Sequence, residues 1–289
     1  MPFVTLRKRR SEKPLPSGGG GVTPFFDPLG WDPHIGIDVA LGLLGWTCEK
    51  AAGGTAAEAL ARLEAASVTG PVVVGPVEMG LLLHQPGSGK AMDADHWVVV
   101  NGVSDGVVRF HDPHGHPFAT LPAHDFLAAW NWQSPTYPAE PYVMRWNFTR
   151  AGDVDPVTAV RGSLPAAARW LGGPQDDGQA SLSEAGASLG GAAAAERLAD
   201  VTEAGLARWQ VDHLVWFAIR VGARRLSDAS AWLGTIGLPA AAAIAWEQAE
   251  LVGGLQHSFV SGDNAAAAAS LRRLAPTYER LREEIAAHL

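Results

Sequence analysis

Residues 95–113 read DHWVVVNGVSDGVVRFHDP, and no other stretch says as much about the architecture. Valines and aromatic residues on either side of Ser104-Asp105-Gly106 are typical of two strands joined by a tight turn. The pattern predicts an antiparallel hairpin in which His96 heads the first strand and Asp112 ends the second. Because these two ends of a hairpin lie together, we expect the two side chains to meet.

A histidine beside an aspartate suits proton transfer. A carboxylate that accepts from one ring nitrogen fixes the tautomer of the imidazole and stabilises its protonated form, as a general base requires. Two simpler interpretations stay open from the residues alone. His96 heads an apolar strand and can be structural, and Asp112 in a D-P-x-G sequence can cap a turn.

The flanking residues extend the predicted domain in both directions. Asp32-Pro33 predicts a helix from about residue 33 to 45, followed by an extended piece, and Thr55 with Glu58 forms a capping box for a second helix through about Ala66. Further expected elements are strands at 71–77 and 142–148, an extended segment at 81–84 and a short helix at 123–130. Helices followed by an antiparallel sheet predict an α+β domain that ends near Arg150.

Beyond Asp155 the sequence predicts helices and no strand. The expected helices cover 156–171, 192–226, 239–260 and 263–288, and the Gly/Ser/Ala-rich residues 172–191 predict a linker. Aromatic and basic residues recur at helical spacing, which favours a buried stripe over an aromatic substrate site. The residues of this stripe are Trp209, His213, Trp216, Phe217 and Arg220.

The predicted organisation is therefore in three parts. Residues 1–23 form a basic, Gly-rich flexible tail, residues 24–150 the α+β domain, and residues 151–289 an all-α helical domain. No apolar signal-peptide core follows the basic residues, so we do not expect export.

Composition narrows the classes of function. The chain has a formal net charge of −8 and a single cysteine, Cys48, which excludes a disulfide framework or a multi-cysteine metal site and favours a reducing, cytoplasmic location. No apolar run is long enough to span a bilayer. Since the basic residues concentrate in the tail and the rest is acidic, we expect neither nucleic acid nor membrane as a partner.

Short motifs in order along the chain resemble the papain-like fold, in particular bacteriocin-processing cysteine peptidases and the acyltransferase family typified by butirosin biosynthesis protein H. The matching segments are Pro71–Val74, Val77-Glu78-Met79 with Leu81–Leu83, His96–Gly102 and Asp112-Pro113. The resemblance covers about residues 30–150, and the family also carries a helical domain after it. It implies a papain-like domain with an antiparallel sheet, with His96 as catalytic base and Asp112 as its orienting partner.

The nucleophile of papain-like enzymes is missing from its expected place. Those enzymes carry a cysteine at the N-terminus of the first helix, where the helix dipole lowers the pKa of the thiol. Residues 33–36, Pro-His-Ile-Gly, contain no cysteine, serine or threonine. Cys48 follows this helix and is expected to be structural, and no glutamine precedes the helix to build an oxyanion hole. A cysteine peptidase is therefore disfavoured.

The resemblance implies an amide synthetase instead. Relatives of the butirosin type transfer an aminoacyl group from a carrier-protein thioester to an aminosugar, and the condensing enzymes of lincosamide antibiotic biosynthesis are similar. A His–Asp base is sufficient when an amine attacks such a thioester directly. The expected partners are an acyl or peptidyl carrier protein, which supplies phosphopantetheine, and a small amine; the chain itself binds no cofactor.

Two further residues are candidates for binding the substrate. Glu78 can hold the amine as carboxylate to ammonium, and His34 lies where the nucleophile is missing; alternatively, Glu78 is a solvated acid and His34 an exposed residue at a helix start. Basic residues would suit the acidic helices of a carrier, although solvated arginines are the simpler interpretation. The basic candidates are Arg220, Arg224 and Arg225, or Arg272 and Arg273.

Three other interpretations are kept. The sequence of His111, Asp112, His114 and His116 can chelate a metal, although ligands crowded into one turn rarely converge, and we predict no metal site. The domain can be a catalytically inactive papain-like module that binds a peptide or carrier. It can also be a peptidase or hydrolase that uses Cys48.

Overall fold

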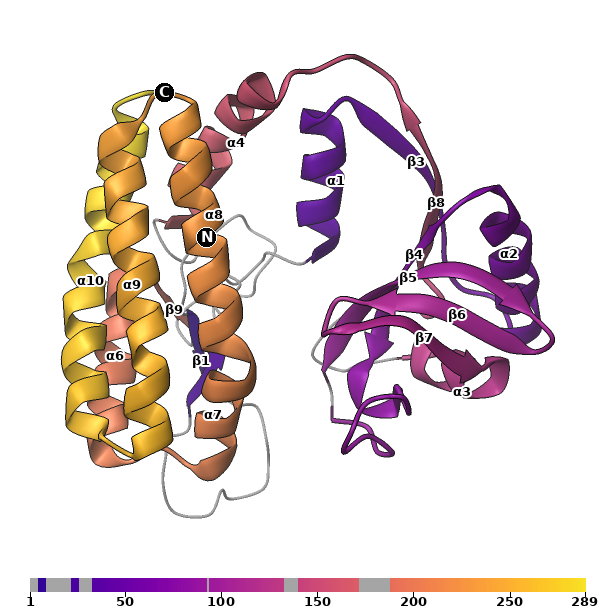
Figure 1. Cartoon of the computed structure of the whole chain (residues 1–289), viewed down its shortest axis with the longest axis horizontal. Helices are drawn as coiled ribbons and strands as arrows, with labels where there is room; N and C mark the ends of the chain where they lie inside the picture. The colour runs from indigo at the N-terminus through magenta and orange to yellow at the C-terminus, as the bar shows by residue number, and fades with distance from the viewer. Residues whose placement is uncertain (1–4, 9–21, 26–32, 93, 133–139, 172–187) are drawn as a thin grey trace. The chain divides into compact units, whose positions relative to one another are not determined.

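A computed structural model describes residues 5–8, 22–25, 33–92, 94–132, 140–171 and 188–289. The chain forms two compact units (Figure 1). Residues 45–153 make the first, which we call the sheet unit. Residues 1–44 and 154–289 make the second, the helical unit.

The sheet unit is built on six antiparallel strands in the order β3-β8-β4-β5-β6-β7. Two α-helices and a short 3-10 helix, η1, complete the described part of this unit. The strands are β3 (Trp46–Ala51), β4 (Val72–Glu78), β5 (Asp95–Ser104), β6 (Val107–Asp112), β7 (His116–Pro122) and β8 (Met144–Arg150), and the helices are α2 (Ala56–Thr69), η1 (Met79–Leu81) and α3 (Ala123–Trp130). The predicted α+β class with an antiparallel sheet is confirmed.

One face of this sheet carries the core. Along β4 and β5 alternate valines are buried, and they pack with Leu63 of α2 and with Phe126 and Trp130 of α3. Alternation arises because successive side chains of a strand point to opposite faces. The two helices therefore cover a single face. The buried valines are Val72, Val74, Val98 and Val100.

Local sequence signals fix the ends of these elements. Helix α2 begins at the predicted capping box, in which the Thr55 hydroxyl accepts from Glu58 N (3.3 Å) and Glu58 accepts from Thr55 N (2.7 Å). The β5–β6 turn uses Asp105 (φ 53°) and Gly106 (φ 70°). Positive φ at both central residues is the geometry that two-residue hairpin loops favour.

A close approach occurs where β4 meets the start of β5. Gly75 (φ 156°) lies so near Trp97 that a Cβ atom there would fall 2.5 Å from Cδ1 of the indole ring and 2.8 Å from the carbonyl oxygen of His96. Contacts this short do not occur between real side chains, so the packing of Trp97 requires glycine at position 75.

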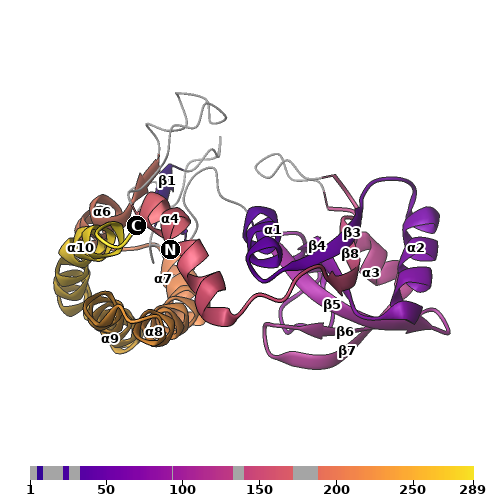
Figure 2. The same cartoon turned by 90° about the horizontal axis from the view of Figure 1, so that it is seen from above.

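The helical unit has its own core, formed by leucine, isoleucine and alanine side chains of its longer helices. Figure 2 shows α6, α8, α9 and α10 grouped around it. The elements are α1 (Pro33–Leu43), α4 (Pro156–Leu171), α6 (Gly191–Ala204), α7 (Arg208–His213), the π-helix η2 (Leu214–Ala218), α8 (Ile219–Thr235), α9 (Pro239–Ser261) and α10 (Asn264–Ala286). A small sheet, in the order β2-β1-β9, joins β2 (Val22–Phe25), β1 (Thr5–Lys8) and β9 (Ser188–Gly190).

The structure differs from the sequence-based expectation in several elements. Residues 5–8 form strand β1 where a flexible tail was expected, β9 is a strand beyond residue 155, and β7 was not predicted. Residues 81–84 form the end of η1 and a turn, not an extended segment. Val22 and Thr23, the last residues of the predicted tail, lie in strand β2. The rest of the predicted tail and most of the predicted linker lie outside the described residues.

Two larger expectations also change. Helix α1, expected within domain 24–150, belongs to the helical unit, where the Leu43 side chain lies against Gly162 of α4. The predicted buried aromatic stripe is wrong for Trp216 and Phe217, which are 64% and 39% exposed. The core of this unit is aliphatic, apart from residues such as Tyr278 and Phe259.

Within the described part of the chain, no helix combines the length and the apolar character that crossing a bilayer requires.

Candidate active site

The β5–β6 hairpin brings the predicted pair together. His96 is the second residue of β5, Asp112 is the last residue of β6, and the two strands pair antiparallel from Ser104–Val107 at the turn to Val99–His111 near the open end. His96 Nε2 lies 2.7 Å from Asp112 Oδ1. A carboxylate can only accept, so Nε2 carries the proton and Nδ1 is the basic nitrogen of the neutral ring.

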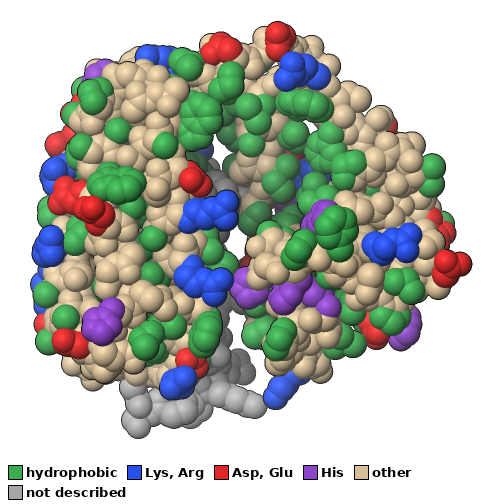
Figure 3. Space-filling view, in the orientation of Figure 1, with side chains coloured by type: hydrophobic (Ala, Val, Ile, Leu, Met, Phe, Trp, Pro, Cys, Tyr) green, Lys and Arg blue, Asp and Glu red, His purple; other side chains and the backbone are tan. Residues whose placement is uncertain are grey.

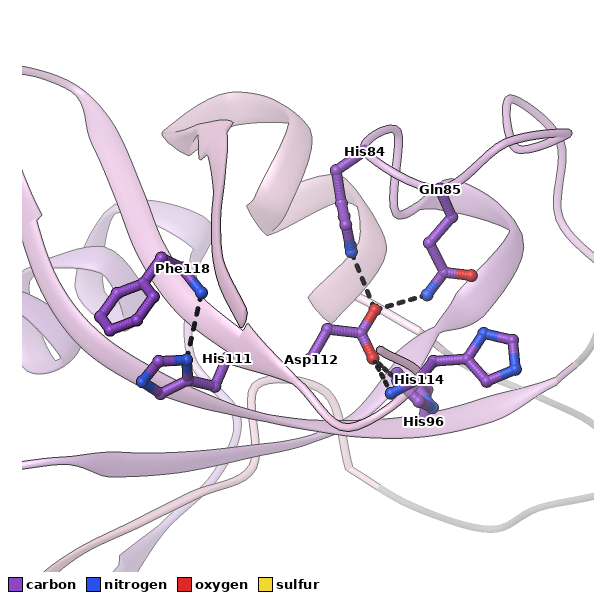
Figure 4. A network of polar contacts seen from close by, with 7 residues as sticks. All are labelled: His84, Gln85, His96, His111, Asp112, His114 and Phe118. Atoms are coloured by element: carbon purple, nitrogen blue, oxygen red, sulfur yellow. Dashed lines mark hydrogen bonds and ion pairs between the residues drawn. The ribbon is translucent and has the colours of Figure 1, made fainter. Parts of the chain in front are cut away.

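Asp112 is the centre of a larger network (Figure 4). Its side chain is buried, and Oδ1 also accepts from His114 N at 2.7 Å. Oδ2 accepts from His84 Nε2 at 2.8 Å and from Gln85 Nε2 at 2.6 Å. We call these five residues the Asp112 cluster. One carboxylate thus takes four donors, two of them imidazoles.

The surroundings of Asp112 favour its charged form. Burial by itself raises the pKa of this carboxyl, but the hydrogen bond and charge of His96, together with the bonds from His114 N and His84, outweigh it. The pKa of Asp112 is therefore held well below its ordinary value. Asp112 is an anion at every pH where the protein would work.

The two imidazoles of the cluster differ in their second nitrogen. Nδ1 of His84 is buried and has no hydrogen-bond partner among the described residues. The His84 ring packs edge-on to the rings of Phe110 and His116, with centroid-to-centroid distances of 4.9 and 5.2 Å. Nδ1 of His96 is not among the buried, unbonded atoms of the described residues. Of the two rings, His96 is the one whose basic nitrogen can meet a substrate.

Sequence analysis missed His84 and Gln85. Both lie in a turn after η1, in which Leu82 N bonds Met79 O and Gln85 N bonds Leu82 O. This turn, 27 residues before Asp112, carries no motif that would link it to the hairpin. A histidine followed by a second polar side chain was the only signal available.

Glu78 is in the sheet unit but is not solvated. It is 1% exposed, and Oε1 accepts from Gly80 N and Met92 N, both at 3.0 Å. This carboxylate thus anchors the loop between β4 and β5. These bonds fit a structural role better than the expected contact with a substrate amine.

His34 is not brought to the Asp112 cluster by the fold of the sheet unit. It lies in the first turn of α1, which is part of the helical unit. The Asp112 cluster is complete without it.

Cys48 and His96 are separated within the sheet unit. Cys48 is on β3, at one edge of the sheet, and two strands, β8 and β4, lie between it and β5. Three strand spacings amount to roughly 14 Å. That separation is far beyond the reach of a hydrogen bond, so the two side chains do not form a dyad.

The histidines and Asp112 of residues 111–116 are the possible metal ligands that the sequence leaves open. Among the described residues, no three His, Cys, Asp or Glu side chains converge as ligands. His111 is on the opposite face of β6 from Asp112, and its Nδ1 accepts from Phe118 N at 3.1 Å. Figure 3 shows histidine side chains grouped on the surface of the sheet unit.

A pocket of about 420 Å³ adjoins Asp112. Val73 and Val99, which pair in register, alternate with buried valines and so belong to the sheet face away from α2 and α3. The pocket lining is mostly apolar. Its residues are Val73, Trp97, Val98, Val99, His111, Asp112, Pro113, Gly115 and Pro117.

Comparison with family models gives a match in the helical unit. A family model described as the YobF C-terminal domain matches residues 185–286, which include α6 to α10. The uncharacterized protein YobF of Bacillus subtilis (strain 168) is 31% identical over 100 residues, or 34% of this chain and 33% of that protein. The match thus spans about a third of the relative's length. The residues that the family model matches do not include the Asp112 cluster.

Proposed function

We propose that this protein is a papain-like, carrier-dependent amide synthetase working in the cytoplasm. It would transfer an aminoacyl group from a phosphopantetheine thioester on a carrier protein to a small amine, such as an aminosugar, in natural-product biosynthesis. His96 is the general base and Asp112 orients it. The resemblance in the β4–β5–β6 motifs supports the reaction class, and the geometry of the Asp112 cluster supports the roles.

One observation carries this proposal: His96 bonds Asp112 through Nε2, which leaves Nδ1 as the free base. A buried anion at one end of an imidazole stabilises the positive charge that appears when the other end takes a proton. The pair is thus arranged to deprotonate a nucleophile and return the proton to a leaving group.

Every proton transfer of the proposed reaction can pass through His96, which Asp112 orients. The amine nitrogen attacks the thioester carbonyl carbon, and His96 Nδ1 takes the proton that the nitrogen loses as the C–N bond forms. The C–S bond then breaks, and the imidazolium protonates the departing thiolate. The products are an amide and the free thiol of the phosphopantetheine arm, and no acyl-enzyme is needed.

The distance of Cys48 from His96 supports direct aminolysis. No described residue with a thiol or hydroxyl side chain makes a hydrogen bond to His96. A cysteine peptidase would need such a nucleophile beside the base. The structure therefore gives no support to the alternative in which Cys48 acts.

The arginines that are candidates for contacting a carrier differ in their ion pairs. Arg272 is bound by Glu203 (2.6 Å) and Asp200 (3.2 Å), with Glu196 at 4.0 Å, so its charge is already balanced. Among the described residues, the one ion pair of Arg224 is with Asp228 at 3.9 Å, and the Arg224 side chain is 86% exposed. Arg224 is thus a better candidate than Arg272 for docking an acidic carrier.

The test uses amino-acid thioesters of N-acetylcysteamine, which reproduce the end of the phosphopantetheine arm, with glucosamine as the amine. We expect the wild type to form the amide with no acyl adduct in its intact mass, and His96→Ala to lower the rate by roughly 100-fold or more. His124→Ala is the matched control, because His124 is on the surface of α3 with an 82% exposed side chain.

Two results would overturn the proposal. Amide formation at the wild-type rate by His96→Ala would remove the base from the mechanism, and an acyl group on Cys48 would restore a covalent one. If the wild type binds the thioester but forms no amide above the uncatalysed rate, the reaction is overturned in favour of the inactive binding module.

A further inference from the structure

The second imidazole on Asp112 has no role in the proposed reaction. His84 and Gln85 come from the turn after η1, so a segment outside the hairpin holds the carboxylate that the hairpin supplies. A carboxylate with one bonded oxygen can rotate about its Cβ–Cγ bond. With both oxygens bonded from different segments, its plane is fixed.

We propose that His84 and Gln85 are positioning residues for His96: by holding Oδ2 of Asp112, they keep Oδ1 aimed at His96 Nε2. The role of His96 as a base rests on the proposed function, whereas the positioning itself rests on the cluster alone. Its chemical result is one fixed tautomer of His96, with the proton on Nε2 and the lone pair on Nδ1.

His84 acts through Asp112 and not on the substrate. Its side chain is 9% exposed, and Nδ1, the nitrogen that would have to act, is buried. The ring is also held in place, because it packs edge-on to the rings of Phe110 and His116, with centroid-to-centroid distances of 4.9 and 5.2 Å. A buried, wedged ring that donates one hydrogen bond is suited to orient its acceptor.

Gln85 supplies the second donor on the same oxygen, at 2.6 Å. A carboxylate with two donors on each oxygen has its charge shared among them. If Oδ2 loses its donors, His96 and His114 N remain as the donors to Asp112, and the carboxylate can turn so that either oxygen faces the ring.

Other ionisable groups lie near the pair. The ring centroid of His114 lies 6.2 Å from that of His96, and Asp95 precedes His96 on β5, opposite Glu78 of β4. The variants below leave all of these groups unchanged, so a change in His96 is assigned to the contacts on Oδ2.

The test is the tautomer of His96, read from the imidazole ¹⁵N chemical shifts of the full-length protein. In the wild type we expect the neutral ring to be almost wholly in the Nε2–H form. Gln85→Leu keeps the approximate size of the side chain and removes its amide donor, so that His84 alone donates to Oδ2. His84→Phe keeps a ring between Phe110 and His116 but cannot donate. In both variants we expect the Nδ1–H form of His96 to become measurable.

Activity gives a second readout, since a mispositioned base lowers turnover and not binding. We expect kcat for amide formation to fall roughly 10- to 100-fold in Gln85→Leu with KM for the thioester unchanged. We expect a similar fall in His84→Phe and a smaller one in His84→Gln, which retains a donor. If His84→Phe fails to fold, Gln85→Leu carries the test alone, because Gln85 has no ring contact to lose.

The outcomes separate the two proposals. An unchanged His96 tautomer in a folded Gln85→Leu variant overturns the positioning role even if the wild type makes amide. A shifted tautomer in a protein that makes no amide supports the positioning role and overturns the proposed reaction.

Discussion

At the scale of single residues, the Asp112 cluster concentrates charge and hydrogen bonds on one buried carboxylate. Four donors converge on its two oxygens within 2.6–2.8 Å. Each of these donors is left without its acceptor if the carboxylate is removed. Asp112 is thus both the orienting group of the proposed base and a stabilising contact between β6, β5 and the turn after η1.

Replacing Asp112 with asparagine should separate these two roles. Asn has one acceptor oxygen and a donor amide, so at least one donor of the cluster faces another donor, and we expect a loss of about 2–4 kcal/mol in the free energy of unfolding. Amide formation should fall by at least 100-fold in the folded variant. Urea denaturation measures the first effect; Asp153→Asn, at a 90% exposed side chain, is the control and should change stability little.

The lowered pKa of Asp112 predicts an acid dependence of stability. The unfolded chain takes up a proton near the ordinary value of 3.8, whereas the folded chain does so only at lower pH. The contribution of Asp112 is therefore complete above about pH 5 and is lost as the pH falls below about 4. The difference in unfolding free energy between the wild type and Asp112→Asn should shrink over that window, and parallel pH profiles would contradict the assignment.

Sequence reasoning predicted the His96–Asp112 contact because a hairpin register fixes it. It did not find His84 and Gln85, because their place in the cluster depends on how a loop returns to the end of the sheet, which no local pattern encodes. Glu78 illustrates the same limit. An acidic residue at the end of a strand is usually solvated, but here the backbone N–H of Met92, far along the loop, donates to its carboxylate.

At the scale of elements, β4 and β5 decide where His96 lies. Gly75 of β4 lies against the indole ring of Trp97, the residue after His96. The register of β4 and β5 shifts between Val74 and Val77. A change in this contact therefore moves the start of β5 and the catalytic candidate with it.

Gly75→Ala tests this dependence. The added methyl group has no room beside Trp97, and φ of 156° is unfavourable for alanine, so we expect a destabilisation of about 1–3 kcal/mol. Hydrogen exchange should also speed up at the β4–β5 junction. Gly152→Ala is the matched control in the same unit, because a Cβ atom there meets nothing within 4 Å; equal effects of the two substitutions would refute the close contact.

The capping box of α2 gives a prediction for an element that contributes no residue to the Asp112 cluster. Removing the Thr55 hydroxyl leaves Glu58 N without its acceptor, so Thr55→Ala should cost about 1 kcal/mol of stability. Thr55→Ser retains the oxygen and should restore most of it. Chemical denaturation of the wild type and the two variants measures the difference in unfolding free energy, provided that the three transitions are equally cooperative.

Elements were predicted from sequence where the pattern was local. The boundaries of α3 and α4, and the positions of β4, β5 and β6, follow from periodicity and turn residues. Strand β7 was missed because Pro117 and Pro122 disfavour a strand, and the structure accommodates them at an edge of the sheet. The aromatic stripe failed because η2 is a π-helix, whose wider turn changes which side chains face the core.

At the scale of the whole molecule, the two units have separate cores. Among the described residues, the buried cluster of the sheet unit lies between Ala59 and Met144, and that of the helical unit between Leu164 and Ile285. A core of its own is the physical requirement for independent folding.

We expect a fragment of residues 45–153 to fold alone. Its circular dichroism should show a cooperative thermal transition, and its amide NMR spectrum should be dispersed. The ¹⁵N shifts of His96 in the fragment should match those of the full chain, because the four hydrogen bonds that Asp112 accepts all come from residues of this unit. A collapsed fragment without cooperative melting would contradict the division into units.

Strand β7 has a last consequence, for self-association. It ends the six-stranded sheet, and an outermost strand can template cross-β growth by pairing with a second molecule. Pro117 and Pro122 have no N–H to donate, and Phe118 between them takes a left-handed backbone (φ 55°) and donates its own N–H to His111. The same irregularities that hid β7 in the sequence thus make this edge a poor template for an added strand.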